Sequence, residues 1–148
     1  MKNIVIATIL ATAALAASAA DVGLRLGRNA GPDTNSAGVT VGQKFGDFGA
    51  ELAFDRTTVG NNNVNRFSLT GSYDVAKVLG GTVAAKVGAA QLNPEYGHTG
   101  YAATVGAGYT YPVTKNVSFT ADYAFQKGQD RVRTFNGNTV SAGVKYSF

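Results

Sequence analysis

The sequence predicts an all-β fold, an eight-stranded antiparallel up-and-down barrel that spans a membrane, preceded by a cleavable signal peptide. Three observations predict this fold. Apolar and polar residues alternate with a period of two in eight stretches, which is the pattern of strands with one apolar and one polar face. After residue 20 no segment is apolar enough for a membrane helix, and a closed barrel is the other structure that satisfies its backbone in lipid. Eight is also an even number, as single-chain bacterial barrels require.

The first 19 residues have the pattern of a secretory signal peptide. Lys2 supplies a positive end, an apolar run covers residues 4–16, and Ala17-Ser18-Ala19 has the small-x-small form of a cleavage site. We therefore expect the mature protein to begin at Ala20. Residues 20–148 then form one barrel domain, as their length suggests.

The composition excludes several classes of function. The chain has no cysteine, which removes disulfides and thiol chemistry. Its net charge of +4 is mild and evenly scattered, so no nucleic-acid partner is expected. Glycine is frequent, with 19 residues against 3 prolines, and no proline lies inside a predicted strand. This balance suits closely packed strands around a narrow interior.

The first four strands are predicted at 21–28, 37–45, 49–56 and 64–73. Their apolar faces are, in order, Val22, Leu24 and Leu26; Val39, Val41 and Phe45; Ala50, Leu52 and Phe54; Phe67, Leu69, Gly71 and Tyr73. Turn residues separate them, as in Gly31-Pro32-Asp33.

The last four strands are predicted at 81–91, 101–111, 117–127 and 139–148. Their apolar faces are, in order, Val83, Ala85, Val87 and Ala89; Ala103, Val105, Ala107, Tyr109 and Tyr111; Val117, Phe119, Ala121, Tyr123 and Phe125; Val140, Ala142, Val144, Tyr146 and Phe148. The segment 74–80 is expected to be a connection.

The end of the last strand is unusual for a protein in water. Chain ends fray, and an apolar end left in water gains nothing, yet Val144 and Tyr146 lead to a terminal Phe148. The segment resembles the closing strand of bacterial outer-membrane barrels, in which these positions are read by the barrel-assembly machinery. In pattern the mature chain resembles the small eight-stranded family of the OmpA transmembrane domain and OmpX. The resemblance implies a location in the bacterial outer membrane, with membrane lipid and the assembly machinery as partners, and a monomer.

The connections alternate in length. Those at 29–36, 57–63, 92–100 and 128–138 are polar and mostly longer than the others. With both chain ends in the periplasm, they become the outer loops, where an extracellular ligand would bind. The same topology sorts the aromatic residues into two interfacial belts, a periplasmic one of Phe45, Tyr73, Tyr109, Tyr111, Tyr146 and Phe148 and an outer one of Phe67, Tyr101, Tyr123 and Phe125.

The polar faces place eight charged side chains in the barrel interior: Arg25, Lys44, Glu51, Asp55, Arg66, Lys86, Asp122 and Lys145. An eight-stranded barrel is about filled by its own side chains, and charges buried there need partners. The hairpins predict pairs of Lys44 with Glu51 and of Asp55 with Arg66, and Asp122 could reach Lys145. Arg25 and Lys86 are left without an obvious carboxylate. A structural network of ion pairs is the favoured interpretation, and an anion-preferring path or gate is the alternative.

Catalytic and metal sites have little support. His98 is the single histidine, in a predicted outer loop, and one histidine without cysteine does not make a typical transition-metal site. Gly106-Ala107-Gly108 lies inside a predicted strand and opens no helix, so it is not a nucleotide motif. No catalytic residue, cofactor or metal is expected.

Three functions remain open at this point. The favoured one is a non-enzymatic outer-membrane barrel with a structural or surface-interaction role through its outer loops. The first alternative is a minimal pore for small solutes. The second is a secreted lipocalin-like binding barrel, in which the apolar residues would face inward and the charges outward.

Overall fold

The computed structural model describes residues 20–31, 33–59, 62–95, 98–129, 133 and 136–148, and every statement about structure below refers to these residues. The predicted signal peptide, residues 1–19, lies outside them. None of the described residues lies in a helix that is long and apolar enough to cross a membrane.

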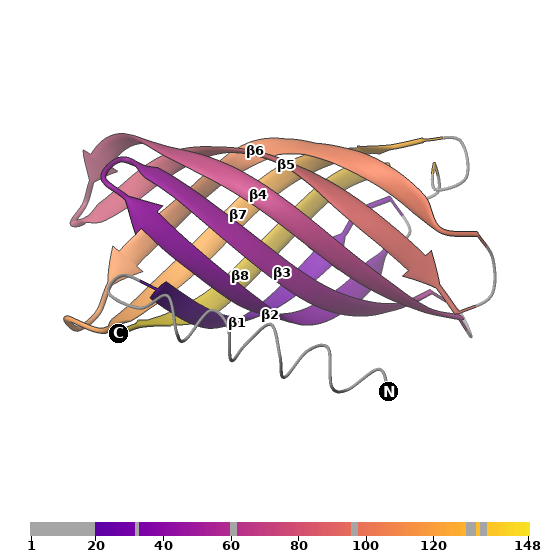
Figure 1. Ribbon diagram of the computed structural model, residues 1–148, viewed down its shortest axis with the longest axis horizontal. Helices are drawn as coiled ribbons and strands as arrows, with labels where there is room; N and C mark the ends of the chain where they lie inside the picture. The colour runs from indigo at the N-terminus through magenta and orange to yellow at the C-terminus, as the bar shows by residue number, and fades with distance from the viewer. Residues whose placement is uncertain (1–19, 32, 60–61, 96–97, 130–132, 134–135) are drawn as a thin grey trace.

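Eight antiparallel strands form one closed barrel (Figure 1). The strands are β1 (Ala20–Asn29), β2 (Thr34–Phe45), β3 (Phe48–Val59), β4 (Asn62–Val78), β5 (Gly81–Pro94), β6 (Gly100–Pro112), β7 (Val117–Gly128) and β8 (Gly137–Ser147). Each strand pairs with its neighbours in sequence, and β1 pairs with β8 to close the sheet. The predicted fold class is confirmed.

The C-terminal end of the chain is fixed by backbone hydrogen bonds. The N–H of Ser147 donates to the carbonyl of Asn116 over 2.8 Å, and the side-chain amide of Asn116 donates to the carbonyl of Ser147 over 2.7 Å. The N–H of Phe148 donates to the carbonyl of Ala20 over 3.3 Å. The terminus is thus bonded to both β1 and the turn before β7.

The apolar face of the sheet points outward, as predicted. Leu24 is 69% exposed and Val87 is 65% exposed, whereas the side chains of Arg25 and Lys86 between such positions are only 17% and 20% exposed. Exposed apolar residues around a polar interior are the arrangement of a barrel in lipid. The lipocalin-like alternative, which needs the reverse arrangement, is wrong.

The short β2–β3, β4–β5 and β6–β7 turns lie at one end of the barrel together with the C-terminus, and the connections after β1, β3, β5 and β7 lie at the other end (Figure 1). Rings gather at the end with the short turns: Phe48 and Tyr73 have centroids 4.9 Å apart, and Tyr146 and Phe148 have centroids 5.1 Å apart. Such rings suit the interface between hydrocarbon and headgroups. We refer to this end as the inner end and to the opposite one as the outer end.

The connections are all shorter than predicted, because the strands extend further into them; the predicted outer loop 57–63, for example, lies between strands that end at Val59 and begin at Asn62. Segment 74–80 is mostly strand, because β4 continues to Val78 through a bulge between Asp74 and Ala76. The bulge interrupts the period of two, which hides the strand in the sequence. Leu79 and Gly80, with φ of 50° and 79°, then form a two-residue turn. At the outer end β5 continues to Pro94, so the loop predicted at 92–100 is shorter.

Candidate functional site

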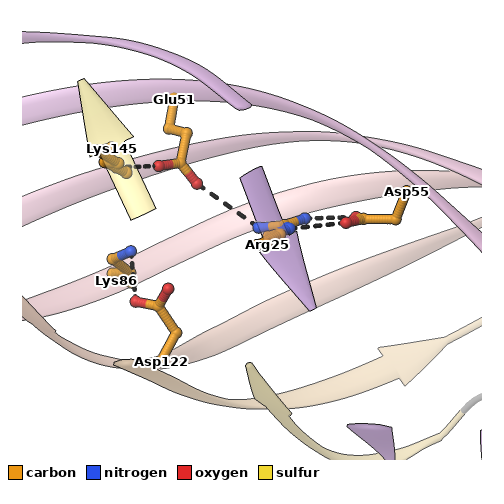
Figure 2. A network of polar contacts seen from close by, with 6 residues as sticks. All are labelled: Arg25, Glu51, Asp55, Lys86, Asp122 and Lys145. Carbon is orange, nitrogen blue, oxygen red and sulfur yellow. Dashed lines mark hydrogen bonds and ion pairs between the residues drawn. The ribbon is translucent and has the colours of Figure 1, made fainter. Parts of the chain in front are cut away.

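Six of the interior charges come from five strands and lie close together (Figure 2). Figure 2 shows Arg25 of β1, Glu51 and Asp55 of β3, Lys86 of β5, Asp122 of β7 and Lys145 of β8, and we call these six residues the central cluster. All six point inward because each lies on the polar face of its strand, where every second side chain points into the barrel. Arg66 of β4 lies beside the cluster and lines the same cavity.

Glycines allow side chains on alternate strands to reach one another. Gly38 of β2 is the register partner of both Arg25 and Asp55. A Cβ atom at Gly38 would lie 2.5 Å from the carbonyl oxygen of Phe54, which is closer than real Cβ atoms approach. Gly108 of β6 has the same role between Lys86 and Asp122, since a Cβ there would lie 2.7 Å from Cε of Lys86. The pairs Arg25–Asp55 and Lys86–Asp122 therefore pass over a glycine on the intervening strand.

Arg25 is the centre of the larger half of the cluster. Its Nε donates to Oδ1 of Asp55 over 2.7 Å and its Nη2 donates to Oδ2 of the same carboxylate, a two-point contact. Its Nη1 lies 3.6 Å from Oε1 of Glu51, and Lys145 donates to the other oxygen of Glu51. The four residues form one continuous chain of alternating charge.

Lys86 and Asp122 form the smaller half. Nζ of Lys86 lies 2.6 Å from Oδ1 of Asp122, at an angle that does not make a hydrogen bond. Both side chains are about four-fifths buried. The contact is therefore an ion pair inside the barrel, separate from the chain around Arg25.

The predicted pairs are largely wrong. Lys44 pairs with Asp74, because Glu51 lies opposite Gly42 while Lys44 lies opposite Gly49 at the inner end. The predicted pair of Asp122 and Lys145 does not form, because Asp122 of β7 lies opposite Ser141 of β8, four residues before Lys145 along the strand.

The remaining pairing predictions fail for a related reason. Arg66 does lie opposite Asp55 across the β3–β4 hairpin, but the carboxylate of Asp55 is bonded to Arg25 instead. Arg25 and Lys86, predicted to lack a carboxylate, both have one. Hairpin reasoning considers adjacent strands, whereas these contacts skip a strand at a glycine.

The outer part of the interior is closed by apolar side chains. Val64, Ala90, Leu92 and Ala102 are buried together, and Arg66 lies opposite Leu92 across β4 and β5. The sequence did not predict this apolar cluster, because its members lie on the faces of their strands that otherwise carry polar residues. Extending the alternation of β5 past Gln91 would have placed Leu92 inside.

Small cavities lie between the described residues of the interior, and three of them bear on its permeability. The largest, about 170 Å³, opens at the inner end between Lys44, Asp74 and the central cluster. The second, about 50 Å³, lies beside Arg25, Arg66 and Asp122, and the third, about 10 Å³, lies between Arg66 and Leu92. The available space therefore narrows from the inner end toward the outer end.

A larger groove of about 1160 Å³ lies at the outer end, against the start of β6 and the end of β7. Tyr101, Lys127, Gln129, Arg133 and Asn136 line it. His98 is exposed near the same end. No group of three or more histidine, cysteine, aspartate or glutamate residues that could hold a metal occurs among the described residues.

The predicted assembly residues lie on the outside of β8. Val144, Tyr146 and Phe148 are 43%, 47% and 65% exposed, and all three face away from the central cluster. Their side chains are accessible to lipid or to another protein. Recognition of these residues by the barrel-assembly machinery stays a prediction.

A closed eight-stranded barrel with an apolar exterior, aromatic ends and a charged interior defines the class of integral outer-membrane β-barrels. The family model described as YfaZ precursor matches residues 1–148, and the chain belongs to this family. No curated protein sequence matches the chain.

Solved structures show the same fold at low sequence identity. The N-terminal β-barrel domain of Pseudomonas aeruginosa OprF is similar with a TM-score of 0.71 and 17% identity, over 88% of this chain and 97% of that one. Neisserial surface protein A (NspA) gives 0.60 and 17%, over 88% and 95%. The Yersinia pestis outer membrane protein Ail gives 0.57 and 15%, over 89% and 100%. These likenesses show the predicted fold, a closed barrel of eight antiparallel strands.

Proposed function

We propose that the protein is a closed, non-enzymatic barrel that acts at the cell surface through its outer connections, while its interior serves a structural role. The observation that carries the proposal is the filled interior. The central cluster crosses the barrel with side chains that are 6–20% exposed, and the apolar residues around Leu92 close the outer part. Such a barrel offers a rigid support for loops.

The minimal pore is the competing function, and conduction distinguishes the two. The 50 Å³ cavity within the cluster and the 10 Å³ cavity beyond it hold a few waters at most, since about 10–15 Å³ is needed for one. We expect no steady conductance when the refolded protein is inserted into planar bilayers. Leu24→Ala, a change on the lipid-facing side, serves as the matched control and should behave identically. Steady ohmic current from the folded protein would overturn the closed-barrel proposal.

The outer groove is the surface that we propose for an extracellular ligand. It combines the ring of Tyr101 with the polar side chains of Lys127, Gln129 and Asn136, and an apolar wall with a few polar groups is typical of binding sites. The barrel holds this groove at the end that the topology directs away from the periplasm.

The absence of cysteine allows a direct test of that topology. We expect a membrane-impermeant maleimide to label Thr99→Cys in intact cells, because Thr99 lies at the outer end and is exposed. Asp47→Cys, in the β2–β3 turn, is the matched control and should react only after the outer membrane is permeabilised. Equal labelling of both variants in intact cells would refute the surface assignment.

The proposed partners beyond a ligand are membrane lipid and the assembly machinery. The exposed apolar band from Leu24 to Val144 supports the first, and the accessible end of β8 supports the second. A closed barrel has no free sheet edge through which to associate, which supports a monomer.

A further inference from the structure

The lipid-facing surface of the barrel is basic along its outer edge. Three exposed side chains, each two positions beyond the last large apolar residue on the outward face of its strand, are basic: Arg28, Arg56 and Lys127. The acidic residues of the strands, by contrast, all line the interior cavities: Asp21, Glu51, Asp55, Asp74 and Asp122. Among the described strand residues, the face toward lipid therefore carries positive charge at the outer end and no carboxylate to balance it.

Lys127 differs from the other two basic residues in its surroundings. Arg28 already contacts the carboxylate of Asp33. Lys127 lies in the outer groove, where Arg133 adds a second cation and none of the described lining residues is acidic. In sequence, the segment 127–133 carries three basic residues against one acidic residue. The groove is therefore complementary in charge to an anion.

The surface next to Lys127 toward the membrane centre is apolar. Ala103 is the register partner of Lys127, and its methyl group leaves the stem of the lysine open on that side. One pair further inward, Val105 lies opposite Phe125, and the two side chains are 58% and 45% exposed. The ring of Tyr101, 57% exposed, borders the groove toward the outer end. Lys127 thus lies where the apolar surface meets the headgroup layer, in which a lysine extends its ammonium group toward water.

We propose that the outer groove binds a lipid with a phosphate headgroup, with the phosphate at Lys127 and Arg133 and an acyl chain against Ala103 and Val105. Charge complementarity supports the phosphate, because two cations and no described carboxylate meet there. The outward, lipid-facing position of the same residues supports the acyl chain, which a soluble anion would lack. The inference rests on the proposed function, which takes this groove as the ligand-binding surface, and it names the class of the ligand.

A single fluorescent reporter can test the site, because the chain has no tryptophan. Tyr101→Trp is refolded into phosphatidylcholine vesicles that contain a minor fraction of phosphatidic acid, with bromine on the acyl chains of one lipid or the other to quench the indole. We expect phosphatidic acid to bind beside Trp roughly fivefold more tightly than phosphatidylcholine, as for one cation at an anionic membrane surface. Tyr146→Trp, at a ring 47% exposed at the inner end, is the matched reporter and should show no preference. Equal binding of the two lipids at Tyr101→Trp, or the same preference at both reporters, would overturn the proposal.

Charge variants in the Tyr101→Trp chain separate a site from a general attraction. Lys127→Gln should remove the preference for phosphatidic acid, and Lys127→Arg should retain it. Lys115→Gln, which removes an exposed lysine of the inner-end turn before β7, should retain it as well. An equal loss in Lys127→Gln and Lys115→Gln would show attraction to the overall charge and contradict the site. Excess inorganic phosphate should not reverse the preference, and reversal would assign the groove to a free anion instead of a lipid.

A second reporter covers the case in which Tyr101→Trp does not fold. Phe125→Trp lies on the same face, two residues from Lys127, and should show the same preference; equal binding of both lipids there would contradict the proposal. Both leaflets of the vesicles have one composition, so the result does not depend on the direction of insertion. Failure of the labelling or conductance tests would refute the proposed function and leave a measured lipid preference standing, whereas absence of the preference would leave those tests unaffected.

Discussion

The ion pair of Arg25 and Asp55 tests whether the interior network stabilises the barrel. Asp55→Asn removes the carboxylate but keeps the shape of the side chain, and it leaves Arg25 with only the more distant carboxylate of Glu51, whose Oε1 lies 3.6 Å from Nη1. The side chains of Asp55 and Arg25 are 6% and 17% exposed. Removing one member of such a buried pair typically costs about 3–5 kcal/mol. Since the adjacent cavity admits some water, we expect the lower value, about 3 kcal/mol, or roughly a hundredfold in the unfolding constant.

The chain contains its own control. Arg28 and Asp33 form an ion pair of the same chemistry at the outer end, with side chains 67% and 71% exposed. Asparagine also tolerates the positive φ of Asp33, 47°. Exposed pairs contribute about 0–1 kcal/mol, so Asp33→Asn should change the unfolding free energy by less than that.

The assay is urea unfolding of the refolded protein in lipid vesicles, read by the different gel mobilities of folded and heated barrels. The unfolding free energy is extrapolated linearly to zero urea. Adding Arg25→Gln to Asp55→Asn removes the uncompensated charge and should recover part of the loss. The reasoning is refuted if Asp55→Asn costs no more than Asp33→Asn.

Four further predictions use the same unfolding assay or a cell-based one. Leu92→Ala should lower the free energy of unfolding by about 2–4 kcal/mol, because Leu92 is buried against Val64 and Ala102. Leu79→Ala, at an exposed turn, is the control and should leave the free energy of unfolding almost unchanged. A similar loss in both variants would contradict the apolar closure of the outer part. Gly106→Ala should prevent stable folding, because a Cβ there would collide with the backbone of Tyr123 and Ala124, whereas Gly71→Ala, whose Cβ would meet only the carbonyl of Val87 at 3.8 Å, should be tolerated; equal tolerance would show that the interior has spare room. Leu79→Asn should raise the free energy of unfolding by up to about 1 kcal/mol, because Asn adopts the left-handed turn conformation of Leu79 more readily than Leu does. A lower free energy of unfolding would mean that Leu79 makes a stabilising contact of its own in the membrane. Phe148→Ser should lower the amount of barrel in the outer membrane of cells while leaving refolding into vesicles unchanged, since Phe148 is exposed and contributes one backbone bond; unchanged amounts in cells would remove the assembly role.

The closing strand illustrates why the fold could be predicted. From Val140 to Tyr146 in β8, the residues on the predicted lipid-facing side are exposed and those on the interior side are partly buried, with Val144 outside and Lys145 inside. The same holds from Leu24 to Asn29 in β1 and from Phe119 to Gly128 in β7. A strand of a membrane barrel contacts lipid on one face and the polar interior on the other, so apolar and polar residues alternate regularly along its sequence.

The candidate site could be predicted only in part. The parity correctly placed Arg25, Glu51 and Lys145 in the interior, but it paired them wrongly. It did not predict that Leu92 and Val64 close the outer part, because the alternation was not followed past Gln91 and the inward faces were expected to be polar. Residues beyond a bulge or near a loop lose the alternation, and β4 past Asp74 was read as a connection for that reason.

By itself the sequence determined the strand faces, the closed eight-stranded barrel and the side of the sheet that meets lipid, because each of these follows from local alternation and from the demand that every backbone group in lipid be bonded. Only the tertiary structure decided which charges pair. Arg25 reaches Asp55 over Gly38, and Lys86 reaches Asp122 beside Gly108, because barrel curvature brings side chains on alternate strands together where the strand between them has none. The same closure directs the hydrogen bonds of Asp55 to Arg25, although Arg66 is its register partner on the adjacent strand.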